Sequence, residues 1–156
     1  MRLHLLAVGT RRPQWEVAGF EEYARRLSGD CTLRLVEIPA ARRSAKGDAR
    51  RWMEEEGQRM LAAIPAGAGV TVLDERGRGW STRELSTRLQ AWLGEGRDRA
   101  LLIGGADGLS EACRARRGQS WRASRRARPH GPVRALSFKA LYRAWSVLHN
   151  HPYHRA

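Results

Sequence analysis

Short apolar runs alternate with helix-patterned segments along this chain, and this alternation limits its fold more than any other feature. We predict strands over residues 2–9, 31–38, 70–73 and 99–103. Helical spacing of apolar residues predicts helices over 14–27, 48–64, 81–93 and 132–150, with a short helix from about residue 109. Such alternation indicates an α/β domain with a mainly parallel sheet and helices on both faces.

The boundaries of these elements come from capping and turn residues. Asp48 is a candidate N-cap, and Ser81 with Glu84 matches a capping box. We predict a basic loop over 40–47, a polar, glycine-rich loop over 74–79 and a turn over 94–98. Residues 121–127 show no clear pattern, and Pro65–Gly69 could connect two lobes.

Length and charge favour one domain that binds a polyanion. The 156 residues, taken as a single domain over 1–156, suffice for a core without disulfides or metal. The net charge of +13 predicts an acidic partner, of which nucleic acid is the better candidate. Residues 101–156 hold eleven basic and two acidic side chains, and seven of the fifteen residues 114–128 are arginine. A preference for arginine over lysine does not explain this loss of acids, so we interpret the segment as a basic binding face.

Cysteine usage and hydropathy point to a soluble cytoplasmic protein. Cys31 and Cys113 form no spaced motif, so we expect two buried thiols in a reducing compartment, with no zinc site. The apolar start of the chain is too short for a signal peptide. No apolar stretch is long enough for a membrane helix.

The last long helix carries two apolar stripes. One consists of Phe138, Leu141, Trp145 and Leu148, and the other of Leu136, Ala140, Ala144 and Val147. A clearly polar face remains only at Lys139, Arg143 and Ser146. A helix that covers one sheet needs a single stripe, so the second favours a homodimer interface. The alternative is that other parts of the same chain bury both stripes.

A buried strand that opens into glycines marks a candidate ligand site. Residues 101–109 read Leu-Leu-Ile-Gly-Gly-Ala-Asp-Gly-Leu. At the carboxyl end of a parallel strand, such a turn usually lines the ligand crevice of an open α/β sheet. The segment lacks the lysine of a P-loop and the glycine spacing of a dinucleotide site. A tight turn without a ligand is the open alternative.

The C-terminus is rich in histidine. Residues 149–156 read His-Asn-His-Pro-Tyr-His-Arg-Ala, but no nearby carboxylate completes a metal site. A tail that folds over a site could use histidine as an acid or base and arginine to hold phosphate. The alternative is a frayed terminus without function.

Several ordered motifs together resemble one family over essentially the whole chain. They are residues 5–10 (Leu-Leu-Ala-Val-Gly-Thr), 101–105, 108–110 (Gly-Leu-Ser), 129–130 (Pro-His), 141–146 (Leu-Tyr-Arg-Ala-Trp-Ser) and 150–155 (Asn-His-Pro-Tyr-His-Arg). The chain is similar to the bacterial SPOUT-class methyltransferases that modify a pseudouridine in helix 69 of 23S ribosomal RNA.

This resemblance implies a fold and a reaction. It implies a homodimer whose C-terminal part forms a trefoil knot, S-adenosylmethionine as methyl donor, and N3 of a pseudouridine on the ribosome as acceptor. It implies no metal.

The resemblance also implies site residues. Those at the cofactor are Leu73, Gly104, Ala123, Ser124, Arg125, Arg126, Ala127 and Arg128, the last six through their backbone. Those at the target base are Tyr153, His154 and Arg155, contributed across the dimer. His154 would take the N3 proton, or Arg155 would stabilise the anion, and the sequence does not separate these roles. Arg114, Arg117 and Arg122 would hold RNA phosphates.

Two positions depart from the family pattern. The family has mostly apolar or small residues before Pro129, where this chain has arginine at 125, 126 and 128. An adenine pocket built from leucine side chains therefore cannot be identical here. Lys139 stands where the family often has glutamate.

Two other functions compete with methyl transfer. The arginines at 125–128 suggest a non-catalytic ribosome- or RNA-binding protein on the same fold. The tail histidines suggest a metal-dependent nuclease, although carboxylate ligands are missing near them.

Overall fold

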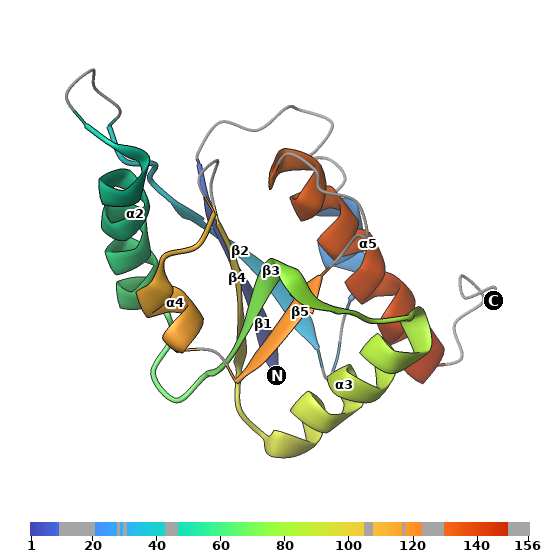
Figure 1. Cartoon of the computed structure of the whole chain (residues 1–156). Coiled ribbons are helices and arrows are strands. Elements are labelled where there is room, and N and C mark those ends of the chain that lie inside the picture. Colours follow the sequence, from blue (N-terminus) through green and yellow to red (C-terminus); the bar gives the residue numbers. More distant parts are fainter. Residues whose placement is uncertain are drawn as a thin grey trace.

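The sheet has five strands, all parallel, in the order β2-β1-β4-β3-β5 (Figure 1). The computed structural model describes residues 1–9, 21–27, 29, 31–42, 47–104, 108–116, 118–122 and 130–149; for 74–78, 119–122 and 130–138 it describes the backbone alone. The strands are β1 (Arg2–Val8), β2 (Thr32–Ile38), β3 (Gly69–Gly79), β4 (Arg99–Ile103) and β5 (Gln119–Arg122). The expected α/β architecture with a parallel sheet is confirmed.

Helices cover both faces of the sheet, as the alternation predicts. They are α2 (Ala49–Ala63), α3 (Thr82–Glu95), α4 (Glu111–Ala115) and α5 (His130–Leu148), and residues 21–26 are also helical. In Figure 1, α2 and α4 lie on one side of the strands and α3 and α5 on the other. Residues 14–20 of the first predicted helix lie outside the described part of the chain.

Strand β1 shows how the sequence builds these two layers. Leu3, Leu5 and Ala7 belong to the core shared with α3 and α5, whereas Leu6 and Val8 belong to the core shared with α2 and α4. All five residues of β4 are buried, as expected for a central parallel strand with helices on both faces. Both cysteines are buried free thiols, as predicted.

The capping residues begin the helices where the sequence places them. The carboxylate of Asp48 accepts the Arg51 N–H at 2.8 Å, and the Ser81 hydroxyl accepts the Glu84 N–H at 3.1 Å. The predicted turn over 94–98 begins too early, because α3 continues through Gly94 to Glu95. Gly96 ends the helix with φ at +70°, a conformation that glycine adopts without strain.

One sequence expectation on one side of the sheet is wrong, and one stretch without an assigned element begins with a strand. Residues 74–79, expected to form a loop, continue β3, and residues 119–122, at the edge of the unassigned stretch, form β5. The two strands pair with each other, with an irregularity in register between Leu73 and Arg78. The polar residues and glycines of these two segments give no strand pattern in the sequence, because the strands are stabilised by hydrogen bonds to a distant segment. A bulge accommodates the irregularity in their register.

More residues of helix α5 are buried than its sequence suggests. Leu141, Ala144 and Trp145 are buried, with members of both apolar stripes among them. Ser146, expected on a polar face, is fully buried and donates its hydroxyl to the Tyr142 carbonyl at 2.8 Å. This back-bond satisfies the hydroxyl inside the core and corrects the prediction. Ala140, Val147 and Leu148 are only partly buried, and the homodimer stays a prediction.

Candidate functional site

The candidate site lies at the carboxyl edge of the sheet, the edge at which all five parallel strands end. Leu73 of β3 pairs with Ile103, the last residue of β4, so the two predicted cofactor residues Leu73 and Gly104 are brought together. Leu73 is buried, and Gly104 is partly exposed. This edge is where ligands bind in open α/β sheets.

Gly104 fits only as glycine. A Cβ atom at this position would lie 2.5 Å from the carbonyl carbon of Gly108 and 2.8 Å from the Leu109 nitrogen. Gly108 itself has φ at +86°. The chain therefore turns back on itself directly after β4, and this requires two glycines. Residues 105–107 lie outside the described residues.

The turn leads into α4, whose position is fixed by α2. The Ser110 hydroxyl accepts the Cys113 N–H at 3.3 Å and caps α4. Gly57 of α2 packs against Ser110, and the Cys113 thiol donates to the Gly57 carbonyl with Sγ 3.5 Å from the oxygen. Burial raises the pKa of the Cys113 thiol, which packs between α4 and α2.

The remaining predicted cofactor residues follow a strand that ends at the same edge. Trp121 of β5 pairs with Leu73, and Arg122 is the last residue of β5. Ala123, Ser124, Arg125, Arg126, Ala127 and Arg128 lie outside the described residues, as do the predicted target-base residues Tyr153, His154 and Arg155. Their roles stay predictions.

Of the three predicted RNA-binding arginines, the structure describes one side chain. Arg114 is partly buried, with 18% of its side chain exposed, and forms an ion pair with Glu111 at 3.1 Å. Its charge is therefore partly neutralised within α4. Arg117 lies outside the described residues, and Arg122 is described by its backbone in β5.

An aromatic stack ends α5 immediately before the tail. The His149 ring stacks on Trp145 at 4.4 Å between centroids, and Trp145 stacks on Tyr142 at 6.0 Å. The His149 Nδ1 lies 2.9 Å from the Trp145 carbonyl, so a protonated Nδ1 donates to one of the last carbonyls of the helix. We did not expect this contact from the sequence, although the i, i+4 spacing of Trp145 and His149 was visible.

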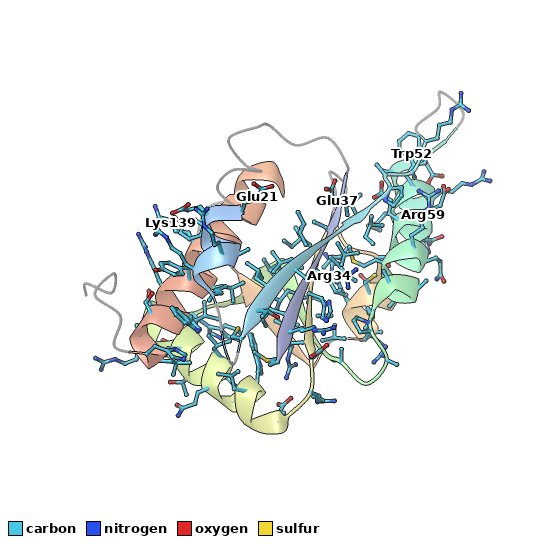
Figure 2. All side chains as sticks on the ribbon, turned by 180° about the vertical axis from the view of Figure 1, so that it is seen from behind. Glu21, Arg34, Glu37, Trp52, Arg59 and Lys139 are labelled. Atoms are coloured by element: carbon cyan, nitrogen blue, oxygen red, sulfur yellow. The ribbon has the colours of Figure 1, made fainter. Side chains whose placement is uncertain are left out.

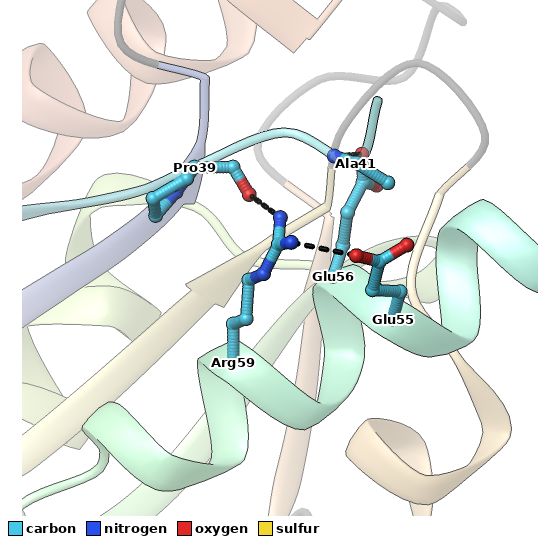
Figure 3. A network of polar contacts seen from close by, with 5 residues as sticks. All are labelled: Pro39, Ala41, Glu55, Glu56 and Arg59. Atoms are coloured by element: carbon cyan, nitrogen blue, oxygen red, sulfur yellow. Dashed lines mark hydrogen bonds and ion pairs between the residues drawn. The ribbon is translucent and has the colours of Figure 1, made fainter. Parts of the chain in front are cut away.

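A second set of contacts missed by sequence reasoning holds the loop after β2 (Figure 3). The buried carboxylate of Glu56 accepts the Ala41 N–H at 3.0 Å, and Arg59 donates to the Pro39 carbonyl at 2.9 Å. No local pattern announces a contact between residues fifteen apart in sequence. This loop also begins at the carboxyl edge, because it follows the last residue of β2.

The opposite edge of the sheet carries a polar pair of its own. His4 is buried, and its Nε2 lies 3.0 Å from a carboxylate oxygen of Asp98. The other oxygen of Asp98 accepts the Arg2 N–H at 3.0 Å. These hydrogen bonds, that of His4 first, hold the pKa of Asp98 below its ordinary value. The pair fastens the starts of β1 and β4 and lies away from the candidate site.

The described residues contain neither a candidate metal site nor a helix that could cross a membrane. Among them, no cluster of three or more histidine, cysteine, aspartate or glutamate side chains could hold a metal ion. None of the helices in this part of the chain has the length and hydropathy needed to cross a membrane.

Comparison with known proteins gives one consistent result. The family described as "Predicted SPOUT methyltransferase" matches residues 1–154. A protein of Methylococcus capsulatus named ribosomal RNA large subunit methyltransferase H is 53% identical, covering 99% of this chain and all of that protein. A protein of Thioalkalivibrio sulfidiphilus with the same name is 52% identical, covering 99% of each chain.

Proposed function

Because this chain belongs to the SPOUT methyltransferase family, we propose that it transfers a methyl group from S-adenosylmethionine to ribosomal RNA. The observation that carries the proposal is the full-length similarity, at 52–53% identity, to two proteins named ribosomal RNA large subunit methyltransferase H. We further propose that the acceptor is N3 of a pseudouridine in helix 69 of 23S ribosomal RNA. The tail motif at 150–155 and the net charge of +13 support this choice.

The residues at the carboxyl edge fit the methyl donor. Leu73 supplies a buried apolar side chain beside the end of β4, and Gly104 keeps the neighbouring backbone free of a side chain. In the proposed site these two residues and the backbone of 123–128 hold the donor. The arginines at 125, 126 and 128 give this chain an adenine pocket that differs from one lined by leucine.

The reaction is an in-line displacement. The sulfonium of S-adenosylmethionine supplies an electrophilic methyl group. N3 of the pseudouridine loses its proton and forms the new N–C bond, while the S–CH3 bond breaks and S-adenosylhomocysteine leaves as a neutral thioether. Positioning is the main contribution of the protein, since well-oriented reactants gain roughly 7–11 kcal/mol.

The tail residues act on the acceptor in this scheme. His154 takes the N3 proton or Arg155 stabilises the resulting anion, and Tyr153 lies at the base. In the proposed homodimer, with its C-terminal trefoil knot, these residues come from the partner chain. The enzyme works in the cytoplasm, where ribosomes are found, and uses no metal.

A methylation assay tests the proposal. The purified protein is incubated with S-adenosylmethionine and large ribosomal subunits that carry unmethylated pseudouridines, and fragments of helix 69 are analysed by mass spectrometry. We expect a gain of one methyl group on a pseudouridine of helix 69. Subunit binding without methyl transfer would instead support a non-catalytic RNA-binding protein.

A further inference from the structure

The loop between β2 and α2 is attached to α2 at both of its ends. At its start, Arg59 donates one N–H to the Pro39 carbonyl at 2.9 Å and another to the Glu55 carboxylate at 2.6 Å (Figure 3). Ala41 is buried, and its N–H donates to the Glu56 carboxylate. Because a carboxylate is rarely buried without hydrogen bonds, Glu56 ties this segment to the helix.

The far end of the loop is held equally closely. A Cβ atom at Gly47 would lie 2.5 Å from the indole nitrogen of Trp52, so the backbone at 47 packs directly against that ring. The next residue, Asp48, caps α2. Figure 2 shows Trp52 and Arg59 on the same helix, beside this loop. The described ends of the loop are therefore fixed to α2 before any ligand binds.

The charge of this segment is strongly basic. We call residues 39–42 and 47–51, the described ends of this segment, the basic arm: they contain Arg42, Arg50 and Arg51, against one acidic residue, Asp48. Arg42, Arg50 and Arg51 are exposed. The Arg50 side chain is 85% exposed, and its 3.2 Å ion pair with Glu54 is a surface pair that a ligand can displace at little cost.

The stability of α2 does not explain these arginines. Arg50 and Arg51 lie in its first turn, which contains no acidic residue. Positive charge at a helix N-terminus opposes the helix dipole and is unfavourable for the helix. Because Arg50 and Arg51 are exposed and do not stabilise α2, an anionic partner explains them better.

The arm lies at the same edge of the sheet as the candidate site. It follows Ile38, the last residue of β2, and the Gly9 N–H donates to the Ile38 carbonyl at 2.8 Å, which joins the ends of β1 and β2. In the sheet order, β2 is two strands from β4, whose last residue, Ile103, precedes Gly104. Neighbouring strands are about 4.8 Å apart, so the two strand ends are about 10 Å apart along this edge.

We propose that the basic arm binds the phosphate backbone of the RNA whose target nucleotide enters the candidate site. This inference rests on the proposed function. Guanidinium groups suit phosphates because they donate bidentate hydrogen bonds and keep their charge. Such contacts position the RNA without reading its sequence.

RNA fits the arm better than an acidic protein does. The exposed residues of the arm that the structure describes are Pro39, Ala40, Arg42, Asp48, Ala49, Arg50 and Arg51. A protein interface has an apolar core rich in aromatic side chains, and none of these residues supplies one.

The test compares two variants that lose the same charge. Arg42, Arg50 and Arg51 are replaced together by glutamine, and the control replaces Arg2, Arg34 and Arg97, which are exposed away from the carboxyl edge. The affinity of each protein for a helix 69 hairpin RNA is measured at several KCl concentrations. S-adenosylmethionine binding and thermal unfolding are measured alongside. The single substitution Arg51→Glu serves as a second variant if the triple variant does not fold.

We expect the arm variant to bind the hairpin about tenfold or more weakly, with the slope of log K against log salt reduced by about 2. Binding of S-adenosylmethionine stays within twofold of wild type, and the control variant retains more RNA affinity than the arm variant. Equal RNA affinity of the two variants would overturn the proposal. Normal hairpin binding with weakened binding to ribosomal subunits would also overturn it and indicate a ribosomal protein as the partner.

The same measurements separate this inference from the proposed function. If the wild-type protein binds RNA through the arm but transfers no methyl group, the arm stands and the proposed function fails. If methyl transfer occurs and the arm variant binds RNA as tightly as the control variant, the proposed role of the arm is wrong and the proposed function stands.

Discussion

Gly57 of α2 packs against Ser110, the N-cap of α4, with no space for a side chain between them. A Cβ atom at 57 would lie 2.8 Å from the Ser110 Cβ and still closer to its hydroxyl. This contact links the helix that carries the basic arm to the turn after β4. Glycine inside a helix normally costs stability relative to alanine, so its presence here reflects packing.

Replacement of Gly57 by alanine is therefore expected to destabilise the protein, although alanine has a higher helix propensity than glycine. We expect the free energy of unfolding to fall by about 1–3 kcal/mol, as for other overpacked sites. Unfolding of the wild type and the variant by denaturant measures this difference in free energy. The double variant Gly57→Ala with Ser110→Gly recovers part of the loss if the clash is its cause, and additive losses would contradict this explanation.

Replacement of Glu56 by alanine removes the acceptor for the buried Ala41 N–H. We expect a loss of about 1–3 kcal/mol in the free energy of unfolding, since a buried donor is left without its partner. RNA affinity should fall as well, because the start of the basic arm is released. Glu56→Gln keeps an acceptor oxygen, so its stability and RNA affinity should lie between those of wild type and Glu56→Ala. An unchanged RNA affinity of Glu56→Ala would show that the contact between Glu56 and the arm is not needed for RNA binding.

Removal of the His149 ring should disturb the tail that follows it. The ring stacks on Trp145 and lies within hydrogen-bond distance of its carbonyl, so it defines where α5 ends. We expect His149→Ala to lower kcat for methyl transfer by about tenfold, with little change in S-adenosylmethionine affinity. His149→Phe keeps the stacking and should recover part of kcat, whereas equal kcat in all three proteins would exclude a positioning role.

We expect the Asp98 carboxylate to stabilise the fold in a way that is lost in acid. Hydrogen bonds to His4 and the Arg2 N–H lower its pKa in the folded state. A depressed folded pKa means that the stabilisation is present above the unfolded pKa, near 3.9, and is lost as the pH falls through the folded pKa. Asp98 is about one-third exposed, so the effect is modest. The measurement is the free energy of unfolding of wild type and Asp98→Asn between pH 7 and pH 3, and their difference should shrink below about pH 4.

Local patterns predicted the parts of the fold that depend on neighbouring residues. The apolar runs of β1 and β4 and the caps at Asp48 and Ser81 are read directly from sequence. By contrast, β5 is a strand because β3 offers it hydrogen-bond partners about fifty residues away, and its residues 119–122 carry no strand pattern. Ser146 was misplaced because its hydroxyl is polar, whereas in the structure a back-bond to the Tyr142 carbonyl satisfies that hydroxyl inside the core.

The candidate site divides in the same way. The glycines after β4 were visible as a turn at a strand end, and the structure adds that Gly104 has no room for a Cβ. The anchoring of the basic arm by Glu56 and Arg59 was not predictable, because it joins a loop to a helix face through buried or half-buried side chains. Residue composition indicates that such a loop is basic but not that its ends are fixed.

Titration of the folded protein with S-adenosylmethionine tests the central claim most directly. We predict saturable binding of one donor per chain, lost or weakened by about tenfold or more in Gly104→Ala, whose new Cβ would meet the Gly108 backbone. Gly94→Ala is the matched control: its Cβ would meet open space in α3, so binding should be retained and stability should rise by about 0.5–1 kcal/mol. No binding by the folded wild-type protein, or equal binding by the Gly104→Ala and Gly94→Ala variants, would contradict the account.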